Sequence, residues 1–337
     1  MTSPAPARRP FAVIRDSLRN APPDLDGVAG AVVTIGTFDG VHRGHRSVIS
    51  LALTRAAAKG RPAAALTFEP PPRAFFMPGR PYFRLSDARN KLRLLAPTGL
   101  DGAIVMSFET ELAQLSAEDF VRNVLVGRYG VSGVVVGFNF HFGRNRTGSP
   151  DFLAAQGAAL GFSVDIVPPL EAGGERVSSG KIRDALAAGH VEETARLLGH
   201  PWFVSGEVVH GDKRGRELGF PTANIRLDPA CGLAHGIYAV RVGIGDKRYD
   251  GVASFGRRPM FDTGAVLLEV FLFDFSGDLY GKMLDVAFIG WIRPELSFDT
   301  QDDLVRRMQE DSRQARARLA QAVDAFPILA NAETFGP

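Results

Sequence analysis

Two histidines with two residues between them, His42 and His45, have the side chains and the spacing to act together on one ligand. On a helix this spacing puts both imidazoles on the same face. Imidazole N–H groups can then donate hydrogen bonds to phosphoryl oxygens as negative charge grows in a transition state. The competing interpretation, two unconnected surface histidines, is disfavoured by the motif that precedes them. The phosphate-binding candidates in that motif are Gly36, Phe38, Asp39, Gly40 and Gly44.

The motif lies between a short apolar run and a helical pattern. Free N–H groups and the positive end of the helix dipole attract anions to a helix N-terminus. Glycines let the backbone approach such a ligand closely. We therefore predict a phosphate-binding loop over residues 36–45, with His42 and His45 as its catalytic residues.

A second segment, residues 206–224, combines glycines and basic residues with two oxygen-bearing side chains, Thr222 and Asn224. Oxygen ligands suit Mg²⁺, and glycine-rich backbone with cations can surround phosphates. The segment lacks the Gly-Lys-Ser/Thr triplet of a Walker A loop, and a long hairpin turn is the competing interpretation. Its phosphate-binding candidates are Gly211, Lys213, Gly215, Arg216 and Gly219.

Glu269 is the one charged residue in the strand-like run 267–273, which the sequence predicts to be apolar on both faces. Glutamate is rarely buried without a reason. Partial desolvation would raise the pKa of this carboxylate towards the value that a general base needs. Glu269 is therefore a candidate general base, with an edge or interdomain charge as the alternative.

The first half of the chain must position the histidines, and its pattern alternates strands with helices. Strands are predicted at 31–35, 63–68, 103–106, 133–136 and 164–167, and helices at 43–59 and 116–129. This alternation indicates a doubly wound parallel α/β sheet, whose ligands sit beyond the carboxyl ends of the strands. Gly36 and Gly137 both follow such ends. Two short helices are expected at 181–188 and 192–198.

The pattern changes from Trp202 onward. Strands predicted at 203–209, 237–242, 249–253, 267–274 and 283–288 are separated by turns that contain Gly or Asp. This is typical of a small antiparallel β-barrel, on which a long helix over 299–321 would pack. We expect an extension and lead-in over 1–30, one domain over 31–199, a second over 200–325 and a tail over 326–337.

Composition excludes several classes of protein. The 337 residues are enough for two domains, and a net charge of +2 without a basic tract argues against a nucleic-acid partner. A single cysteine, Cys231, excludes an internal disulfide and a thiolate zinc site. The chain has neither a secretory signal pattern nor an apolar run near the ~20 residues that span a bilayer. We expect a cytoplasmic protein without a membrane partner.

The 36–45 segment resembles the signature of the HxGH nucleotidyltransferases, and its context is similar to the bacterial bifunctional riboflavin kinase/FMN adenylyltransferase family. The resemblance runs from about Ala31 to Ala320. It implies that the barrel domain uses ATP and Mg²⁺ to phosphorylate riboflavin to FMN, releasing ADP. It also implies that the α/β domain joins FMN and ATP into FAD, releasing pyrophosphate. The supporting motifs are residues 67–70, 115–120, 137–143, 177–183 and 219–224.

In the α/β domain the resemblance implies a role for five residues. His42 and His45 would stabilise the transition state of adenylyl transfer. Arg183 and Ser179 would meet the β- and γ-phosphates of ATP, and Asn139 would bind the flavin substrate near its phosphate.

In the barrel domain the resemblance implies that Thr222 and Asn224 help to hold Mg²⁺. Glu269 would take the proton from the 5′-hydroxyl of riboflavin. The chain departs from the family pattern at Gly180, where Thr or Ser is usual, and at Pro71, where His is common. A missing hydroxyl could weaken ATP binding by ~1 kcal/mol, the usual contribution of one hydrogen bond.

Three alternatives follow. The first is a riboflavin kinase with an impaired adenylyltransferase domain, suggested by Gly180. The second is a nucleotidyltransferase for another phosphorylated metabolite, such as a pantetheine or nicotinamide precursor, which leaves the second half unexplained. The third is a non-catalytic flavin- or nucleotide-binding module, against which the histidines and Glu269 argue.

Overall fold

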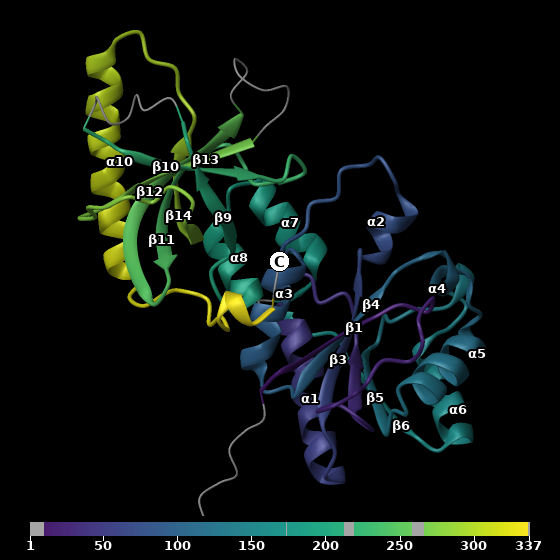
Figure 1. Cartoon of the computed structure of the whole chain (residues 1–337). Coiled ribbons are helices and arrows are strands. Elements are labelled where there is room, and N and C mark those ends of the chain that lie inside the picture. The colour runs from purple at the N-terminus through teal and green to yellow at the C-terminus, as the bar shows by residue number, and fades with distance from the viewer. Residues whose placement is uncertain (1–9, 173, 212–218, 258–265, 336–337) are drawn as a thin grey trace, which may run out of the picture. The chain divides into compact units, whose positions relative to one another are not determined.

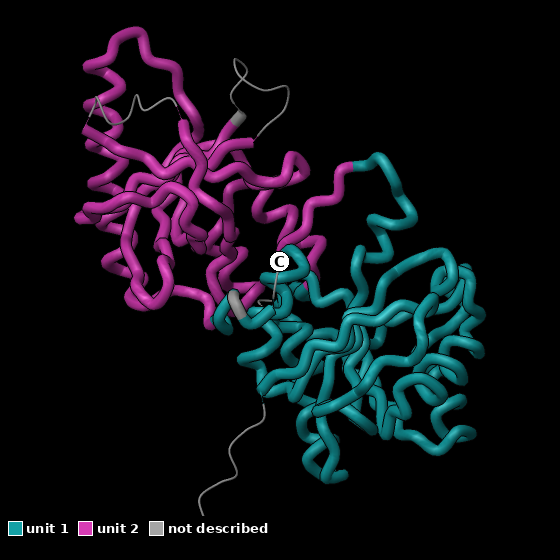
Figure 2. Tube along the Cα trace, in the orientation of Figure 1, with its two compact units in different colours: residues 1–80, 87–177, 329–337 teal, residues 81–86, 178–328 magenta. Residues whose placement is uncertain are grey.

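The computed structural model describes residues 10–172, 174–211, 219–257 and 266–335. The chain forms two compact units (Figure 2). Unit 1 comprises Met1–Arg80, Asp87–Val177 and Leu329–Pro337, and unit 2 comprises Pro81–Ser86 and Ser178–Ile328. Neither unit is one continuous stretch of chain. Helices α7 (Ser179–Ala187) and α8 (Val191–Leu198) belong to unit 2, whereas the sequence-based boundary at 199/200 stays a prediction.

Unit 1 is built on a six-stranded sheet in which every pair of neighbouring strands is parallel (Figure 1). The strand order is β1-β4-β3-β2-β5-β6. The predicted doubly wound parallel sheet is confirmed. The strands are β1 (Ala12–Asp16), β2 (Val32–Ile35), β3 (Ala63–Glu69), β4 (Gly102–Ser107), β5 (Gly133–Gly137) and β6 (Ser163–Val167).

Strand β1 is not among the predicted strands. It lies within the segment interpreted as an extension and pairs with β4 at the edge of the sheet. Its sequence, Ala-Val-Ile-Arg-Asp, has only a short apolar run before two charged residues. Asp16 is nevertheless buried, because its carboxylate binds Arg128 (Nη2–Oδ1 2.6 Å) and the Tyr129 hydroxyl (2.6 Å). These side-chain hydrogen bonds add to the backbone pairing with β4 and to the packing of Ala12 and Ile14 on the core.

Helix α1 (Arg43–Lys59) has the predicted bounds, and Gly60 ends it in a left-handed conformation. The predicted helix 116–129 begins at the Ser116 cap as expected, but only α5 (Ala117–Asp119) is α-helical. The following η2 (Phe120–Arg128) is a π-helix. Its apolar residues complete the hydrophobic core against the sheet. Further helices of unit 1 are α2 (Pro72–Phe76), α3 (Ala88–Leu95), η1 (Ala96–Thr98), α4 (Thr110–Gln114), η3 (Arg144–Arg146) and α6 (Pro150–Leu160). Two short strands, β7 (Glu171–Ala172) and β8 (Glu175–Arg176), pair with each other.

The end of the chain packs on helix α3. Two hydrogen bonds join Ala330 to Arg93. The Ala330 N–H donates to the Arg93 carbonyl (3.0 Å), and the Arg93 guanidinium donates to the Ala330 carbonyl (3.1 Å). The short helix η4 (Ala332–Phe335) follows, and its Phe335 is 5% exposed. Leu329–Pro337 is therefore part of unit 1, although it follows the last helix of unit 2.

Unit 2 contains the predicted antiparallel barrel, closed in the order β10-β13-β12-β11-β14-β9. The structure adds β10, which the sequence had left in a loop because this short run mixes polar and apolar residues. Along β13, alternate residues from Val266 to Leu272 are buried, so one face of this strand is interior and the other is partly open. The strands are β9 (Phe203–Val209), β10 (Thr222–Leu227), β11 (Gly236–Ile244), β12 (Lys247–Arg257), β13 (Val266–Leu272) and β14 (Met283–Pro294).

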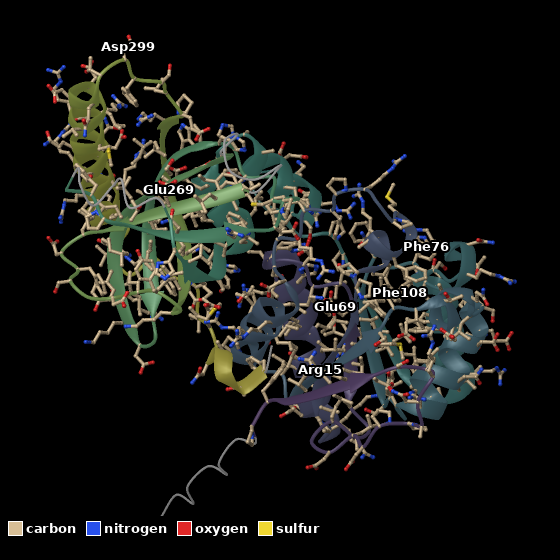
Figure 3. All side chains as sticks on the ribbon, turned by 45° about the horizontal axis from the view of Figure 1, so that its top comes forward. Arg15, Glu69, Phe76, Phe108, Glu269 and Asp299 are labelled. Carbon is tan, nitrogen blue, oxygen red and sulfur yellow. The ribbon has the colours of Figure 1, made fainter. Side chains whose placement is uncertain are left out.

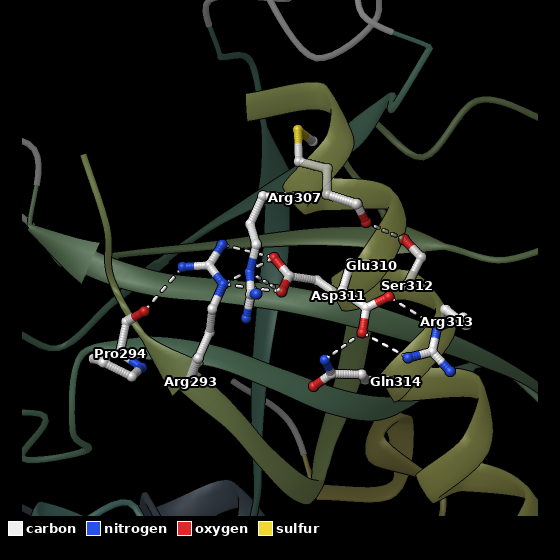
Figure 4. A network of polar contacts seen from close by, with 9 residues as sticks. Arg293, Pro294, Arg307, Glu310, Asp311, Ser312, Arg313 and Gln314 are labelled. Carbon is white, nitrogen blue, oxygen red and sulfur yellow. Dashed lines mark hydrogen bonds and ion pairs between the residues drawn. The ribbon is translucent and has the colours of Figure 1, made fainter. Parts of the chain in front are cut away.

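Helix α10 (Gln301–Gln321) packs on β11, β12 and β14, as predicted for a long helix against the barrel. A buried ion pair joins helix and barrel: Arg293 of β14 binds Asp311 of α10 with an Nη2–Oδ2 distance of 2.6 Å (Figure 4). Arg307 approaches the same carboxylate at 3.2 Å. No helix among the described residues is long and apolar enough to cross a membrane.

Candidate active sites

The loop between β2 and α1 holds the histidine motif in a strained backbone. Phe38 and Val41 have φ angles of 48° and 44°, in the left-handed region that glycine tolerates and other residues avoid. Each such residue costs on the order of 1–3 kcal/mol, and such strain concentrates at functional sites. Gly40 has a φ of 80°, which explains the glycine at this position.

His42 caps the N-terminus of α1. Its Nδ1 accepts a hydrogen bond from the backbone N–H of His45 at 3.1 Å. An accepting Nδ1 carries no proton, so the neutral His42 ring carries its proton on Nε2. A Cβ on Gly44 would lie 3.1 Å from Cε1 and 3.2 Å from Nδ1 of His42. Gly44 therefore leaves room for the capping ring.

The two imidazoles stack, with centroids 3.6 Å apart and planes inclined by 13°. Burial lowers the pKa of His45 well below its usual 6.5, and the nearby His42 and Lys91 lower it further. His45 is therefore neutral at neutral pH. Its Nδ1 has no hydrogen-bond partner within the described part of the chain. The two imidazoles thus lie together as a stacked pair in which His45 is neutral.

The sheet topology places this loop at a switch point. From β2 the chain moves to β3 and β4, and it later returns to β5 on the other side of β2. Loops that follow the two diverging strands border the crevice where such sheets bind ligands. Asn139 lies exposed in the loop after β5, and its carbonyl is 3.1 Å from His141 Nδ1.

Aromatic residues that the sequence did not single out lie near the ends of β3 and β4. Phe76 is 62% exposed, and its ring contacts Phe108 (5.6 Å between centroids) and Phe75 (5.3 Å). The backbone N–H of Phe108 donates to the carbonyl of Glu69, the last residue of β3. Figure 3 labels Phe76, Phe108 and Glu69 in this unit. Single phenylalanines carry no sequence signal that separates an exposed cluster from a core.

Ser179 and Arg183 belong to unit 2, at the start of α7. Ser178 is the N-cap and accepts from the Lys181 N–H at 3.4 Å, so Ser179 is the first helical residue. Ser179 and Arg183 are four residues apart and share one face of this helix. The guanidinium of Arg183 donates to the Phe83 carbonyl (2.6 Å) and the Tyr82 hydroxyl (2.8 Å).

In the barrel the predicted residues come together across strands. Asn224 of β10 lies opposite Glu269 of β13, and Glu269 lies opposite Ser254 of β12. Directly paired residues project from the same face of a sheet, and so does Thr222, two residues before Asn224. Figure 3 labels Glu269 in unit 2. Glu269 is on the partly open face of this strand, between Leu267 and Phe271 along the strand and beside Asn224 and Ser254 across it.

The glycine-rich segment is described only in part. A Cβ on Gly211 would come within 2.4 Å of Asn224 Nδ2, so any other residue here would displace the Asn224 side chain. Gly219 has a φ of 83°. Lys213, Gly215 and Arg216 lie outside the described residues.

A pocket of about 300 Å³, which the sequence did not predict, is lined by Ala223 and Val270, from the face of β10 and β13 opposite to Asn224 and Glu269. Tyr280, one of its lining residues, stacks on His210 with centroids 3.9 Å apart. The lining also includes Thr222, Pro221 and residues 275–279. The pocket therefore adjoins one of the two proposed magnesium ligands.

Comparison with known proteins assigns both halves. The family model for FAD synthetase matches residues 26–181, and the model for riboflavin kinase matches residues 198–319. A bifunctional riboflavin kinase/FMN adenylyltransferase of Pseudomonas fluorescens is 41% identical over 86% of this chain and 94% of its own length. The protein of the same name from Escherichia coli strain K12 is 40% identical over 85% and 92%.

Among solved structures, that of a macrolide-efflux protein from Streptococcus pneumoniae superposes with a TM-score of 0.79 at 31% identity. It covers 90% of this chain and 99% of its own. The family models and the curated relatives support both the riboflavin kinase and the FMN adenylyltransferase activity. Both halves match over almost the whole length of the curated relatives, and the chain therefore belongs to the bifunctional riboflavin kinase/FMN adenylyltransferase family.

Proposed function

We propose a residue-level account of the two activities, phosphorylation of riboflavin to FMN and adenylylation of FMN to FAD. For the second activity, an oxygen of the FMN phosphate attacks the α-phosphorus of ATP. A new P–O bond forms, the α–β bridging bond breaks and pyrophosphate leaves. This step needs no proton transfer from FMN, whose phosphate is largely ionised at neutral pH. The residues must position two anions and stabilise charge as it moves.

His42 and His45 supply this stabilisation. The observation that carries the assignment is the stacked pair at the N-terminus of α1, with the proton of His42 on Nε2. From there an N–H can donate to a phosphoryl oxygen in the transition state, supported by the positive end of the helix. Asn139 contacts the flavin substrate, and Ser179 and Arg183 contact the β- and γ-phosphates of ATP. These three assignments are supported by the positions of the residues in the motifs described above.

The exposed ring of Phe76, with the half-buried rings of Phe75 and Phe108 beside it, accepts the flavin ring system. A planar aromatic ligand gains by stacking on such rings, and a large exposed aromatic side chain in a folded protein marks an interaction site. The 62% exposure of Phe76 supports this assignment.

In the barrel, Thr222 and Asn224 hold Mg²⁺, which neutralises phosphate charge when bound. The residues fit the ion, because hydroxyl and amide oxygens are hard donors and both project from the face that carries Glu269. Glu269 accepts the proton of the riboflavin 5′-hydroxyl as that oxygen attacks the γ-phosphorus of ATP, and ADP leaves. The pocket beside Thr222 receives the nucleotide.

One assay tests both assignments. Purified protein is incubated with Mg²⁺, excess ATP and either riboflavin or FMN, and the flavins are separated by chromatography. The wild type should give FMN and then FAD. His42→Asn should convert riboflavin to FMN without forming FAD. Glu269→Gln should form FAD from added FMN but phosphorylate riboflavin about 10²–10⁴-fold more slowly, the usual contribution of a general base.

Each variant is the control for the other, because each retains one activity of the same chain. A His42→Asn protein that forms FAD at the wild-type rate contradicts the role of the histidine pair. A Glu269→Gln protein with wild-type kinase turnover contradicts the general-base assignment.

A further inference from the structure

A buried lysine in unit 1 has no role in the account above. Lys91, on helix α3, is 3% exposed. Its Nζ lies 3.4 Å from each of three oxygens at the end of β3: Thr67 Oγ1, the Phe68 carbonyl and Glu69 Oε2. Charged pairs at optimal geometry are closer, at about 2.7–2.9 Å. The ammonium therefore lies at the same distance from a hydroxyl, a backbone carbonyl and a carboxylate at the end of β3.

Lys91 is connected to the histidine loop. Thr67 Oγ1, one of its three contacts, donates to the carbonyl of Thr37 at 3.3 Å. Strands β2 and β3 pair up to Ile35 and Leu66, so the loop after β2 starts beside Thr67. The charge of Lys91 also reaches His45, where it contributes to the lowered pKa. A single hydroxyl thus separates the ammonium from the loop that binds phosphates.

Charge explains why a lysine is useful here. A buried ion pair rarely stabilises a fold more than apolar residues of the same volume would. Glu69, whose side chain is 24% exposed, would by itself present a negative charge next to two anionic substrates. Lys91 cancels that charge from below the surface, and it fixes the end of β3 against the loop.

We propose that Lys91 is a positioning residue for adenylyl transfer, which neutralises Glu69 and holds the end of β3 so that the histidine loop can receive the phosphate groups of FMN and ATP. This inference rests on the proposed adenylyltransferase site. The lysine keeps its proton throughout and touches neither substrate. Lys91 therefore affects the affinity of the site for the anionic substrates, and this effect depends on the positive charge of its ammonium group.

The test compares Lys91→Met with Lys91→Arg in FAD formation from FMN and ATP. Lys91→Met should raise the KM for FMN about tenfold, the effect of losing one favourable charge interaction, while kcat changes less. Lys91→Arg keeps the charge and should stay within about threefold of the wild type. Lys59→Met is the matched control: it removes the same charge from unit 1, at the far end of α1, where Nζ binds the Ser132 carbonyl.

A second variant separates charge from folding. If Lys91→Met is poorly folded by circular dichroism, Glu69→Gln/Lys91→Met restores electrical balance and should recover most of the lost affinity for FMN. The proposal is overturned if folded Lys91→Met keeps a wild-type KM, if Lys91→Arg is as impaired as Lys91→Met, or if the double variant recovers nothing. Failure of the proposed function itself would look different, because the wild type would then form no FAD.

Discussion

At the scale of single residues, the neutrality of His45 has a consequence for stability. Its pKa in the folded protein is well below the 6.5 of an exposed histidine. Below pH 6.5 the unfolded chain therefore binds a proton that the folded protein does not, and the free energy of unfolding falls as the pH falls.

His45→Asn should reduce this acid sensitivity. Urea unfolding between pH 5 and 7.5 measures it, with His141→Asn as a control on an exposed histidine of the same unit. The expected result is a shallower loss of stability below pH 6.5 for His45→Asn only. Equal slopes in the wild type and His45→Asn would contradict a lowered pKa.

Gly180 gives a second prediction at this scale. A Cβ at this position would lie 3.8 Å from Ser178 Oγ, an ordinary van der Waals contact, so a Cβ is accommodated here. Gly180→Thr should restore the missing hydroxyl and lower the KM for ATP in FAD formation about fivefold, as expected for one hydrogen bond of ~1 kcal/mol. Riboflavin phosphorylation should not change.

Gly180→Ala is the matched control, since it removes the flexibility of glycine without adding a hydroxyl. If the threonine and alanine variants have the same KM for ATP, the hydroxyl has no part in binding. A wild-type enzyme that accumulates FMN without FAD, corrected by Gly180→Thr, would favour the alternative of an impaired adenylyltransferase.

At the scale of elements, the pair between Arg293 and Asp311 anchors α10 to the barrel. Both side chains are more than nine-tenths buried. Asp311→Ala leaves an uncompensated buried charge and should lower the free energy of unfolding by about 3–5 kcal/mol. Urea denaturation of the intact protein measures this, and Glu310→Ala, on the exposed side of the same helix, should have a much smaller effect. Similar losses for both variants would contradict an anchoring role.

The sequence was sufficient for elements with a strong pattern. Helix α1 has regular apolar spacing and Gly60 at its end, and both of its bounds were predicted. Residue type and spacing singled out the histidine motif and Glu269, whereas the family resemblance assigned Thr222 and Asn224 to Mg²⁺. The bounds of α1 and the proximity of the two histidines depend on short-range order in the chain.

Other features depend on distant partners and could not be predicted. β1 is held by Arg128 and Tyr129, more than 110 residues away. Lys91 looks like any lysine of an amphipathic helix until β3 surrounds its ammonium with oxygens. The strand β10 is recognisable only once β9 and β13 flank it.

At the scale of the whole molecule, each unit is completed by a segment from elsewhere in the chain. Leu329–Pro337 completes unit 1, where Arg93 and Arg15 bind its carbonyls and Phe335 is buried. Removing residues 329–337 should destabilise unit 1, since burial of a phenylalanine alone contributes about 1.5–3 kcal/mol.

The truncated protein should therefore lose FAD formation at a lower temperature than riboflavin phosphorylation. Activity measured after heating at a series of temperatures distinguishes the two. Phe335→Ala is the milder companion variant and should shift FAD formation in the same direction. Equal loss of both activities in the truncated protein would contradict a specific role in unit 1.

The same discontinuity sets an order of events during synthesis. About 150 residues separate Val177 from Leu329. At a translation rate of 5–20 residues per second, the ribosome needs about 8–30 seconds to make them. For that interval the adenylyltransferase unit, although its other residues are made first, lacks the segment that packs on α3. The half of the enzyme that begins the chain is thus the half that is finished last.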